Sequence, residues 1–329
     1  MKKLFSLALA LVLVLSMATV AMASTADSGG FTDMSQVTIT KRYTLTNPGT
    51  TSPAETITFT VSQPTITGND AATAPAALPT VSPIVYQAGD AGTAAKTATI
   101  TLPTYTDVGI YTYKITENGN NKAGVTYYGT QFTLVVSVVM DETNGKVRVA
   151  GVHCEDMTES GAQKTSEFTN IYSAGCLNVS KKVTGLYGDT TKYFDVQVTL
   201  NGEAGKVYEA IAVSGGSNGA NPTSVTVGES YTFKLKDGDT ITFSNIPYGV
   251  TYTVVESDYT GAGYDAAGYE FSDREQKIDS ASDCVTITNN KGGSVDTGVA
   301  LDSLPFILIL AVCAGTAVLM VVKRRKSEY

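Results

Sequence analysis

Three polar residue types recur in one order along the chain, and each ends a run in which apolar and polar residues alternate. The first set is Lys41, Glu117 and Asn170, and the second set is Lys181, Glu256 and Asn289. Side chains of a strand alternate between its two faces, so each polar group shares a face with the apolar residue two positions before it. Both sets are therefore predicted to lie inside an apolar core.

A buried amine, acid and carboxamide in contact can form an amide bond between lysine and asparagine. Burial disfavours charge, so it lowers the pKa of a lysine and raises the pKa of a glutamate. A neutral Lys41 amine is then a nucleophile toward Asn170, while a protonated Glu117 polarises the carboxamide and carries a proton to the departing ammonia. The same roles are assigned in the second set to Lys181, Glu256 and Asn289. Each reaction happens once and needs no cofactor, so the chain is not expected to be an enzyme acting on an outside substrate.

Neighbouring residues leave alternatives open in the second set. Lys182 and Asn290 are adjacent in sequence but have the opposite strand phase, and Glu270 could replace Glu256 as the acid. Exposed or ordinarily paired side chains are the plain interpretation for any one of these residues, because lysine is seldom buried. The recurrence of the ordered set in the correct strand phase favours the reactive interpretation.

The elements that must position these residues are strands. The chain holds 18 Tyr and 31 Gly, a composition typical of short strands joined by tight turns. The Asn144-Gly145 dipeptide indicates a hairpin, and residues 64–95 are predicted to form a long surface loop with one short strand at 81–86. The expected fold class is all-β, with two tandem Ig-like β-sandwich domains.

The repeated sets divide the chain into domains. A leader at 24–35 precedes an N-terminal domain at 36–173, and a C-terminal domain follows at 174–292. The connection at 173–175 is short, so the two domains are expected to lie end to end with limited swing.

Both ends of the chain carry export signals. Residues 1–23 have the basic start, apolar run and small-residue cleavage site of a signal peptide. In the terminal segment 293–329, residues 304–322 form an uncharged apolar run of 19 residues, close to the length of a membrane-spanning helix. The basic residues 323–326 place the tail inside the cell and the bulk of the chain outside. A plain single-span membrane protein is the alternative.

A motif before the apolar run adds a resemblance. Residues 294–298 read Ser-Val-Asp-Thr-Gly, and this order of motif, span and basic stop resembles the cell-wall sorting signal of Gram-positive surface proteins. The resemblance implies that a sortase cleaves between Thr297 and Gly298 and transfers the Thr297 acyl group to an amine. The usual motif contains a proline that this chain lacks, so the class of sortase stays open.

Together with the two Lys–Glu–Asn sets, this signal makes nearly the whole chain resemble the sortase-assembled backbone pilins of Gram-positive bacteria, of the streptococcal type with intramolecular isopeptide bonds. The resemblance implies a secreted structural subunit of a covalent pilus, held transiently in the membrane and then on the cell wall. The implied partners are a sortase, identical subunits joined head to tail, peptidoglycan and accessory pilins. The lysine that links subunits would be Lys164, with Lys96, Lys122 and Lys146 open. A non-polymerised wall-anchored adhesin, with ligand contacts on the 64–95 loop, is the alternative.

Charge and the remaining reactive residues narrow the function further. The signal holds two basic residues, and the segment after Thr297 holds four basic and two acidic ones, which leaves 17 basic against 29 acidic residues and a net charge of −12. Such a surface argues against binding nucleic acid. His153 is the one histidine, so a metal site or a serine-protease triad has little support. Cys154, Cys176 and Cys284 leave a disulfide open, with Cys154–Cys176 as one pairing.

Overall fold

A computed structural model describes residues 24–26, 32–90, 95–129, 131–158 and 161–293, together with the single residues 310 and 316. The predicted signal peptide (1–23), sorting motif (294–298) and basic tail (323–326) lie outside the described residues, and so does the apolar run at 304–322 apart from those two positions. Among the helices that the structure describes, none has the length and apolar character needed to cross a bilayer.

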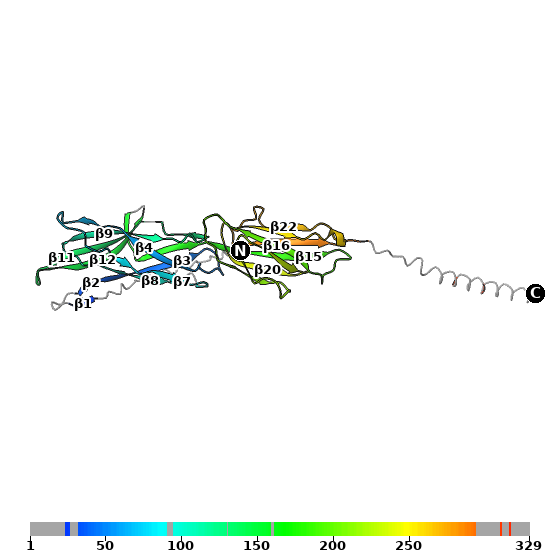
Figure 1. Ribbon diagram of the computed structural model, residues 1–329, viewed down its shortest axis with the longest axis horizontal. Helices are drawn as coiled ribbons and strands as arrows, with labels where there is room; N and C mark the ends of the chain where they lie inside the picture. The colour runs from blue at the N-terminus through cyan, green and yellow to red at the C-terminus, as the bar shows by residue number, and fades with distance from the viewer. Residues whose placement is uncertain are drawn as a thin grey trace, which may run out of the picture.

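The described chain is all-β and forms two units that lie end to end along the long axis of the molecule (Figure 1). Two short strands at the start, β1 (Ser24–Ala26) and β2 (Thr32–Met34), pair with each other. The first unit extends from β3 to β14, and the second extends from β15 to β23.

The first unit consists of two sheets. The five-stranded sheet has the order β10 (Val125–Thr126), β14 (Glu167–Tyr172), β3 (Gln36–Leu45), β8 (Lys96–Thr101) and β6 (Thr80–Val81). The larger sheet has the order β13 (Gly161–Lys164), β12 (Lys146–Thr158), β11 (Gln131–Asp141), β9 (Gly109–Asn118), β4 (Glu55–Val61) and β7 (Ile84–Tyr86), and β5 (Thr65–Thr67) pairs with β9. Their inner faces share one core, which includes Ile39, Tyr113 and Phe168.

The second unit repeats this plan with fewer strands. Its six-stranded sheet has the order β18 (Ser224–Val225), β17 (Ile211–Gly215), β20 (Thr240–Pro247), β15 (Ala174–Thr184), β23 (Ser282–Asn290) and β22 (Gly268–Phe271). Its three-stranded sheet has the order β19 (Ser230–Leu235), β16 (Phe194–Asn201) and β21 (Thr251–Glu256). A short 3-10 turn, η1 (Thr260–Ala262), precedes β22.

In each unit the first and last strands are parallel neighbours. Lys41 of β3 is opposite Phe168 of β14, and Lys181 of β15 is opposite Ile287 of β23. Buried and partly exposed residues alternate along β3 and β15, as expected for strands with one face on the core. This pairing brings the two ends of each unit together on one sheet.

The segment at 64–95 differs from the single strand predicted at 81–86. In its described part, 64–90 and 95, there are three short strands, and β6 joins the five-stranded sheet whereas β7 pairs with β4 of the other sheet. The chain leaves the first sheet at Ser82-Pro83, where proline lacks the N–H that a continuous ladder would need.

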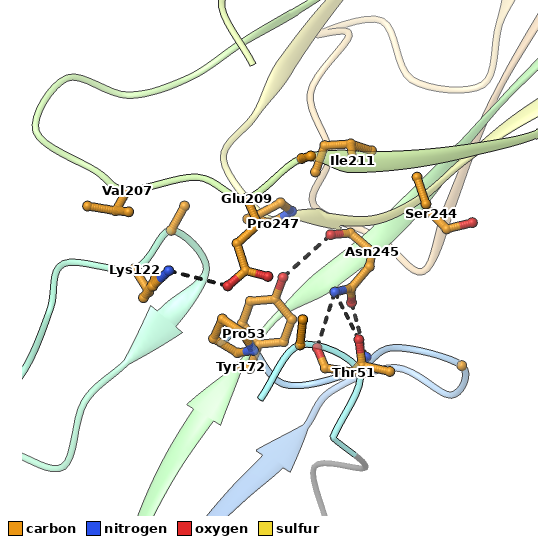
Figure 2. Close-up of a pocket in the computed structure, with 16 residues that line it drawn as sticks. Thr51, Pro53, Lys122, Tyr172, Val207, Glu209, Ile211, Ser244, Asn245 and Pro247 are labelled. Carbon is orange, nitrogen blue, oxygen red and sulfur yellow. Dashed lines mark hydrogen bonds and ion pairs between the residues drawn. The ribbon is translucent and has the colours of Figure 1, made fainter. Parts of the chain in front are cut away.

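A set of hydrogen bonds joins the two units. The Asn47 side chain donates to the carbonyl of Ala174 and to the hydroxyl of Tyr248, each at 2.6 Å. The Asn245 side chain accepts a hydrogen bond from the Thr51 amide at 3.1 Å and donates to the Thr51 carbonyl at 3.2 Å. A pocket of about 320 Å³ remains between the units beside these contacts (Figure 2).

Candidate functional site: two buried lysine, glutamate and asparagine trios

The structure brings the first predicted set together in the core of the N-terminal unit. The Lys41 amine lies 2.5 Å from Oε2 of Glu117 and 2.5 Å from Oδ1 of Asn170. The Asn170 amide nitrogen donates to Oε1 of Glu117 at 2.6 Å. The three side chains therefore form a closed ring of contacts, which we call the N-terminal trio.

The N-terminal trio is assembled from both sheets. Lys41 and Asn170 come from the parallel neighbours β3 and β14, and Glu117 comes from β9 in the other sheet. The side chains of Lys41 and Glu117 have no exposed surface, and Asn170 is likewise 0% exposed. Phe168 contributes to this seal, with the Lys41 amine 5.9 Å from the centroid of its ring.

Burial sets the protonation of the nucleophile. Removal from water lowers the pKa of Lys41, although the nearby Glu117 and Glu55 carboxylates act in the opposite direction. A buried ammonium is costly unless it is paired. The amine is thus closer to its neutral, nucleophilic form than an exposed lysine is.

A backbone donor completes the first site, and sequence reasoning missed it. The Tyr128 N–H donates to Oδ1 of Asn170 at 2.9 Å. This oxygen gains negative charge when an amine adds to the carboxamide, so the donor is placed to stabilise the intermediate. No residue type signals a backbone N–H, and it could be found only from the pairing of β10 with β14.

A second buried acid near the first site was also missed. Glu55 is 7% exposed, and its Oε2 accepts hydrogen bonds from Asn120 at 3.1 Å and from Tyr127 at 3.0 Å. Burial raises the pKa of Glu55. In the sequence Glu55 starts a strand two residues before Ile57, and this period-two position is the signal that could have found it.

The second predicted set also meets in the C-terminal unit, where the Lys181 amine contacts both other members. The Lys181 amine contacts Oδ1 of Asn289 and lies 3.2 Å from Oε2 of Glu256. The amine is 4.4 Å from the centroid of the Phe194 ring. The side chains of Lys181 and Glu256 have no exposed surface, and Asn289 is also buried. We call this group the C-terminal trio.

Burial shifts both titratable members of the C-terminal trio toward neutrality. It lowers the pKa of Lys181, with Glu256 opposing the change. It raises the pKa of Glu256, with Lys181 opposing the change. Desolvation is the larger cause for each group, so an uncharged amine beside an uncharged acid is favoured relative to the same pair in water.

The residues that the sequence left open as alternatives in the second set are not part of the C-terminal trio. Lys182 and Glu270 are exposed. The Asn290 side chain donates to Asp265 at 2.6 Å and accepts from the Thr184 hydroxyl at 3.1 Å. The strand phase therefore distinguishes the buried residues from their neighbours.

The lysines considered for linking subunits lie in different settings. Lys164 is exposed on the edge strand β13, opposite Glu155 of β12, and Lys146 is also exposed. Lys96 forms an ion pair with Asp90 at 2.5 Å, and Lys122 forms one with Glu209 at 3.3 Å. Thr297 and Gly298 are outside the described residues.

The pairing of Cys154 with Cys176 left open from the sequence is wrong. Cys154 is buried in the core of the N-terminal unit, whereas Cys176 lies in β15 of the C-terminal unit, and both thiols are free. Cys284 is also free. His153 pairs with Glu155 at 2.8 Å.

Comparisons with known proteins agree with this geometry. Residues 37–173 match the family described as the Spy0128-like isopeptide containing domain, and residues 175–291 match a domain of unknown function, DUF7601. A pilin of Streptococcus pyogenes serotype M1 is 29% identical over 314 residues, covering 88% of this chain and 91% of the relative.

Solved structures of streptococcal major pilins are also similar to this chain. The crystal structure of the major pilin from Streptococcus pyogenes is 27% identical, with a TM-score of 0.54, and the match covers 79% of this chain and 99% of that chain. The T3.2 major pilin of the same species is 25% identical, with a TM-score of 0.53, over 78% of this chain and 98% of that one.

The N-terminal unit, with its buried Lys–Glu–Asn trio, matches the isopeptide-domain class. The matches along both units make the identification more specific. The chain as a whole is similar to the pilins of the streptococcal type.

Proposed function

We propose that this protein is a structural subunit of a cell-surface pilus, built from two Ig-like domains that are each closed by an autocatalytic Lys–Asn amide bond. The observation that carries the proposal is the N-terminal trio, in which one amine lies 2.5 Å from both the acid and the carboxamide inside a sealed core. Holding reacting groups in this arrangement removes about 7–11 kcal/mol of the barrier at best.

The geometry supports a reaction in which Glu117 transfers each proton. The Lys41 ammonium first gives a proton to Oε2 of Glu117, and the neutral amine adds to Cγ of Asn170. The oxyanion that forms on Oδ1 accepts the Tyr128 N–H. Glu117 then protonates the amide nitrogen, which leaves as ammonia, and Glu117 takes the remaining excess proton from the new amide. One C–N bond forms, one breaks, and Glu117 ends protonated.

Each bond would tie the first strand of its domain to the last. The joined residues are 129 and 108 positions apart, and closing loops of this size removes denatured-state entropy worth roughly 4–5 kcal/mol each by the disulfide relation. Force that enters at one parallel strand and leaves at its neighbour would then pass through a covalent bond. This property suits a shaft under tension.

Polymerisation requires a second kind of amide bond. A sortase would cleave after Thr297 and transfer its acyl group to Lys164 of the next subunit, and the exposed position of Lys164 on an edge strand supports this assignment. The apolar run at 304–322 would hold the chain in the membrane until cleavage. The last subunit would pass to peptidoglycan, and accessory pilins would join the same polymer.

Two measurements test the proposal. The intact mass of the chain should be lower than the sequence mass by two ammonia molecules, and an unchanged mass would refute the internal bonds. Wall extracts separated in denaturing detergent should show a ladder of covalent multimers that collapses to one band in the Lys164→Arg variant. A single band in the unaltered strain would identify a non-polymerised adhesin instead.

A further inference from the structure

The segment 119–129 connects the N-terminal trio to the neighbouring domain. Near its end, the Tyr128 N–H donates to Oδ1 of Asn170 at 2.9 Å, and the Tyr127 hydroxyl donates to Oε2 of Glu55 at 3.0 Å. The Asn170 oxygen is the atom on which charge develops during bond formation. The position of this segment therefore determines whether the intermediate has its donor.

The start of the same segment is held by the C-terminal domain. The Val207 N–H donates to the Asn121 carbonyl at 2.9 Å, and the Ala123 N–H donates to the Val207 carbonyl at 3.0 Å. Asn121 has a φ of 53°, a left-handed conformation that Asn adopts more readily than other non-glycine residues. Contacts with the other domain support this conformation.

An ion pair strengthens the same connection. Glu209 of the C-terminal domain lies 3.3 Å from the Lys122 ammonium and also accepts the Ala54 N–H at 2.6 Å. Figure 2 shows Lys122 and Glu209 facing each other at the pocket between the domains. Glu209 thus joins two separate loops of the N-terminal domain.

The N-terminal domain itself holds the segment at both ends of its first half. The Asn120 side chain donates to Oε2 of Glu55 at 3.1 Å and to the Thr56 carbonyl at 2.8 Å. Strand β10 contributes two residues to the ladder, Val125 opposite Tyr172 and Thr126 opposite Ile171. The Ser173 N–H adds one more hydrogen bond, to the Gly124 carbonyl at 2.9 Å. The contacts from Val207 and Glu209 add to these at Asn121, Lys122 and Ala123, between the two places where the N-terminal domain holds the segment.

We propose that the C-terminal domain positions the oxyanion donor of the N-terminal trio, with Val207 and Glu209 as positioning residues that act through segment 119–129. This inference rests on the proposed function, because it concerns the rate of the same Lys41–Asn170 bond. It implies an order of events in which the N-terminal bond closes fully only after the C-terminal domain has folded against it. The C-terminal trio has no such dependence on this segment.

The test follows both bonds in newly synthesised full chain. Cell-free synthesis is pulsed, stopped in acid at intervals, and the loss of ammonia at each site is read by peptide mass spectrometry. Val207→Pro removes the N–H that donates to the Asn121 carbonyl, and Val207→Ala keeps it. Val207 is 46% exposed, so neither change leaves a cavity in the core. Loss of a whole oxyanion donor costs 10²–10³ in rate, so loosening it should slow the N-terminal bond about tenfold in Val207→Pro.

Slower formation of the C-terminal bond in Val207→Pro would show that this variant disturbs folding. A second pair of variants tests the inference in that case. Glu209→Ala removes the contacts to Lys122 and Ala54, and Glu229→Ala removes an exposed charge from the same domain. The N-terminal bond should slow in Glu209→Ala alone, with the C-terminal bond unchanged. Equal N-terminal rates in Glu209→Ala and Glu229→Ala would overturn the inference. Absence of ammonia loss at both sites in the unaltered chain would instead overturn the proposed function.

Discussion

Lys41 and Lys181 are surface-type residues placed in apolar cores. Each amine touches an acid and a carboxamide oxygen, and each lies near a phenylalanine ring. Water would compete for all of these contacts and would keep the amine charged, so the reactivity of each trio depends on its seal. The same burial makes an incomplete trio expensive, because a charge left without its partner cannot be solvated.

Removing the acid of one trio should leave the other intact. In Glu117→Ala the mass deficit should fall from two ammonia molecules to one, and Glu256→Ala should have the same effect at the other site. The melting temperature of the affected domain should drop sharply, since the cross-link is worth roughly 4–5 kcal/mol. Intact mass and calorimetry measure the two effects.

The exposed Glu270 supplies the control for this prediction. Glu270→Ala should keep both ammonia losses and the stability of the unaltered chain. A full deficit of two ammonia molecules in Glu117→Ala would show that the acid is not needed for the reaction.

Asp283 in β23 allows a prediction about pH. The residue is 3% exposed, and its Oδ2 has no hydrogen-bond partner. Burial raises its pKa from 3.8, with Ser280 opposing the change and Asp273 and Asp279 adding to it, while Tyr252 is the titratable group that faces it from β21. The folded state therefore binds more protons than the unfolded state above pH 3.8, so this group lowers stability as the pH rises through the raised pKa.

Asp283→Asn should remove that part of the pH dependence. The melting temperature of the C-terminal domain should fall less between acid and neutral pH in the variant than in the unaltered chain. Asp265→Asn, at an exposed position, is the control. Parallel curves for the unaltered chain and Asp283→Asn would contradict the burial argument.

At the scale of elements, the alternation of side chains along strands was the pattern that predicted the two trios. The phase of Lys41 and Lys181 followed from their apolar neighbours, because a strand has only two faces. The Tyr128 N–H could not be predicted, since it depends on how β10 pairs with β14 and a backbone donor has no residue type. The division of 64–95 between two sheets could not be predicted either, because a two-residue strand such as β6 is too short to show a periodic pattern.

The start of β15 shows how closely the elements of the second domain approach. A Cβ atom added at Gly175 would lie 2.1 Å from the Ser280 carbonyl oxygen, whereas one added at Gly219 would meet nothing within 4 Å. Gly175→Ala should therefore destabilise the C-terminal domain by about 1–3 kcal/mol, the usual cost of overpacking. Chemical denaturation of Gly175→Ala and Gly219→Ala measures the difference, and equal midpoints would show that the strand adjusts without cost.

At the scale of the molecule, two domains in series transmit force only as well as the joint between them. The joint here contains hydrogen bonds from Asn47 and Asn245, the ion pair of Lys122 with Glu209, and the backbone contacts of Val207. These groups come from several loops and gather beside one pocket, so a bend that opens this part of the joint must break some of them. The domains should therefore move as one elongated body.

The joint can be loosened without touching either trio. In the double variant Asn47→Ala and Asn245→Ala, the bonds to Ala174, Tyr248 and Thr51 are lost, and alanine is placed at a φ of 58°, where it is strained. Small-angle X-ray scattering should then show a shorter average length and a broader distribution of distances, while the mass deficit stays at two ammonia molecules. The matched control is Asn221→Ala, because Asn221 bonds to Lys234 within the C-terminal domain. If the double variant scatters like the unaltered chain, stiffness comes from the shape of the interface, and the asparagine bonds contribute little to it.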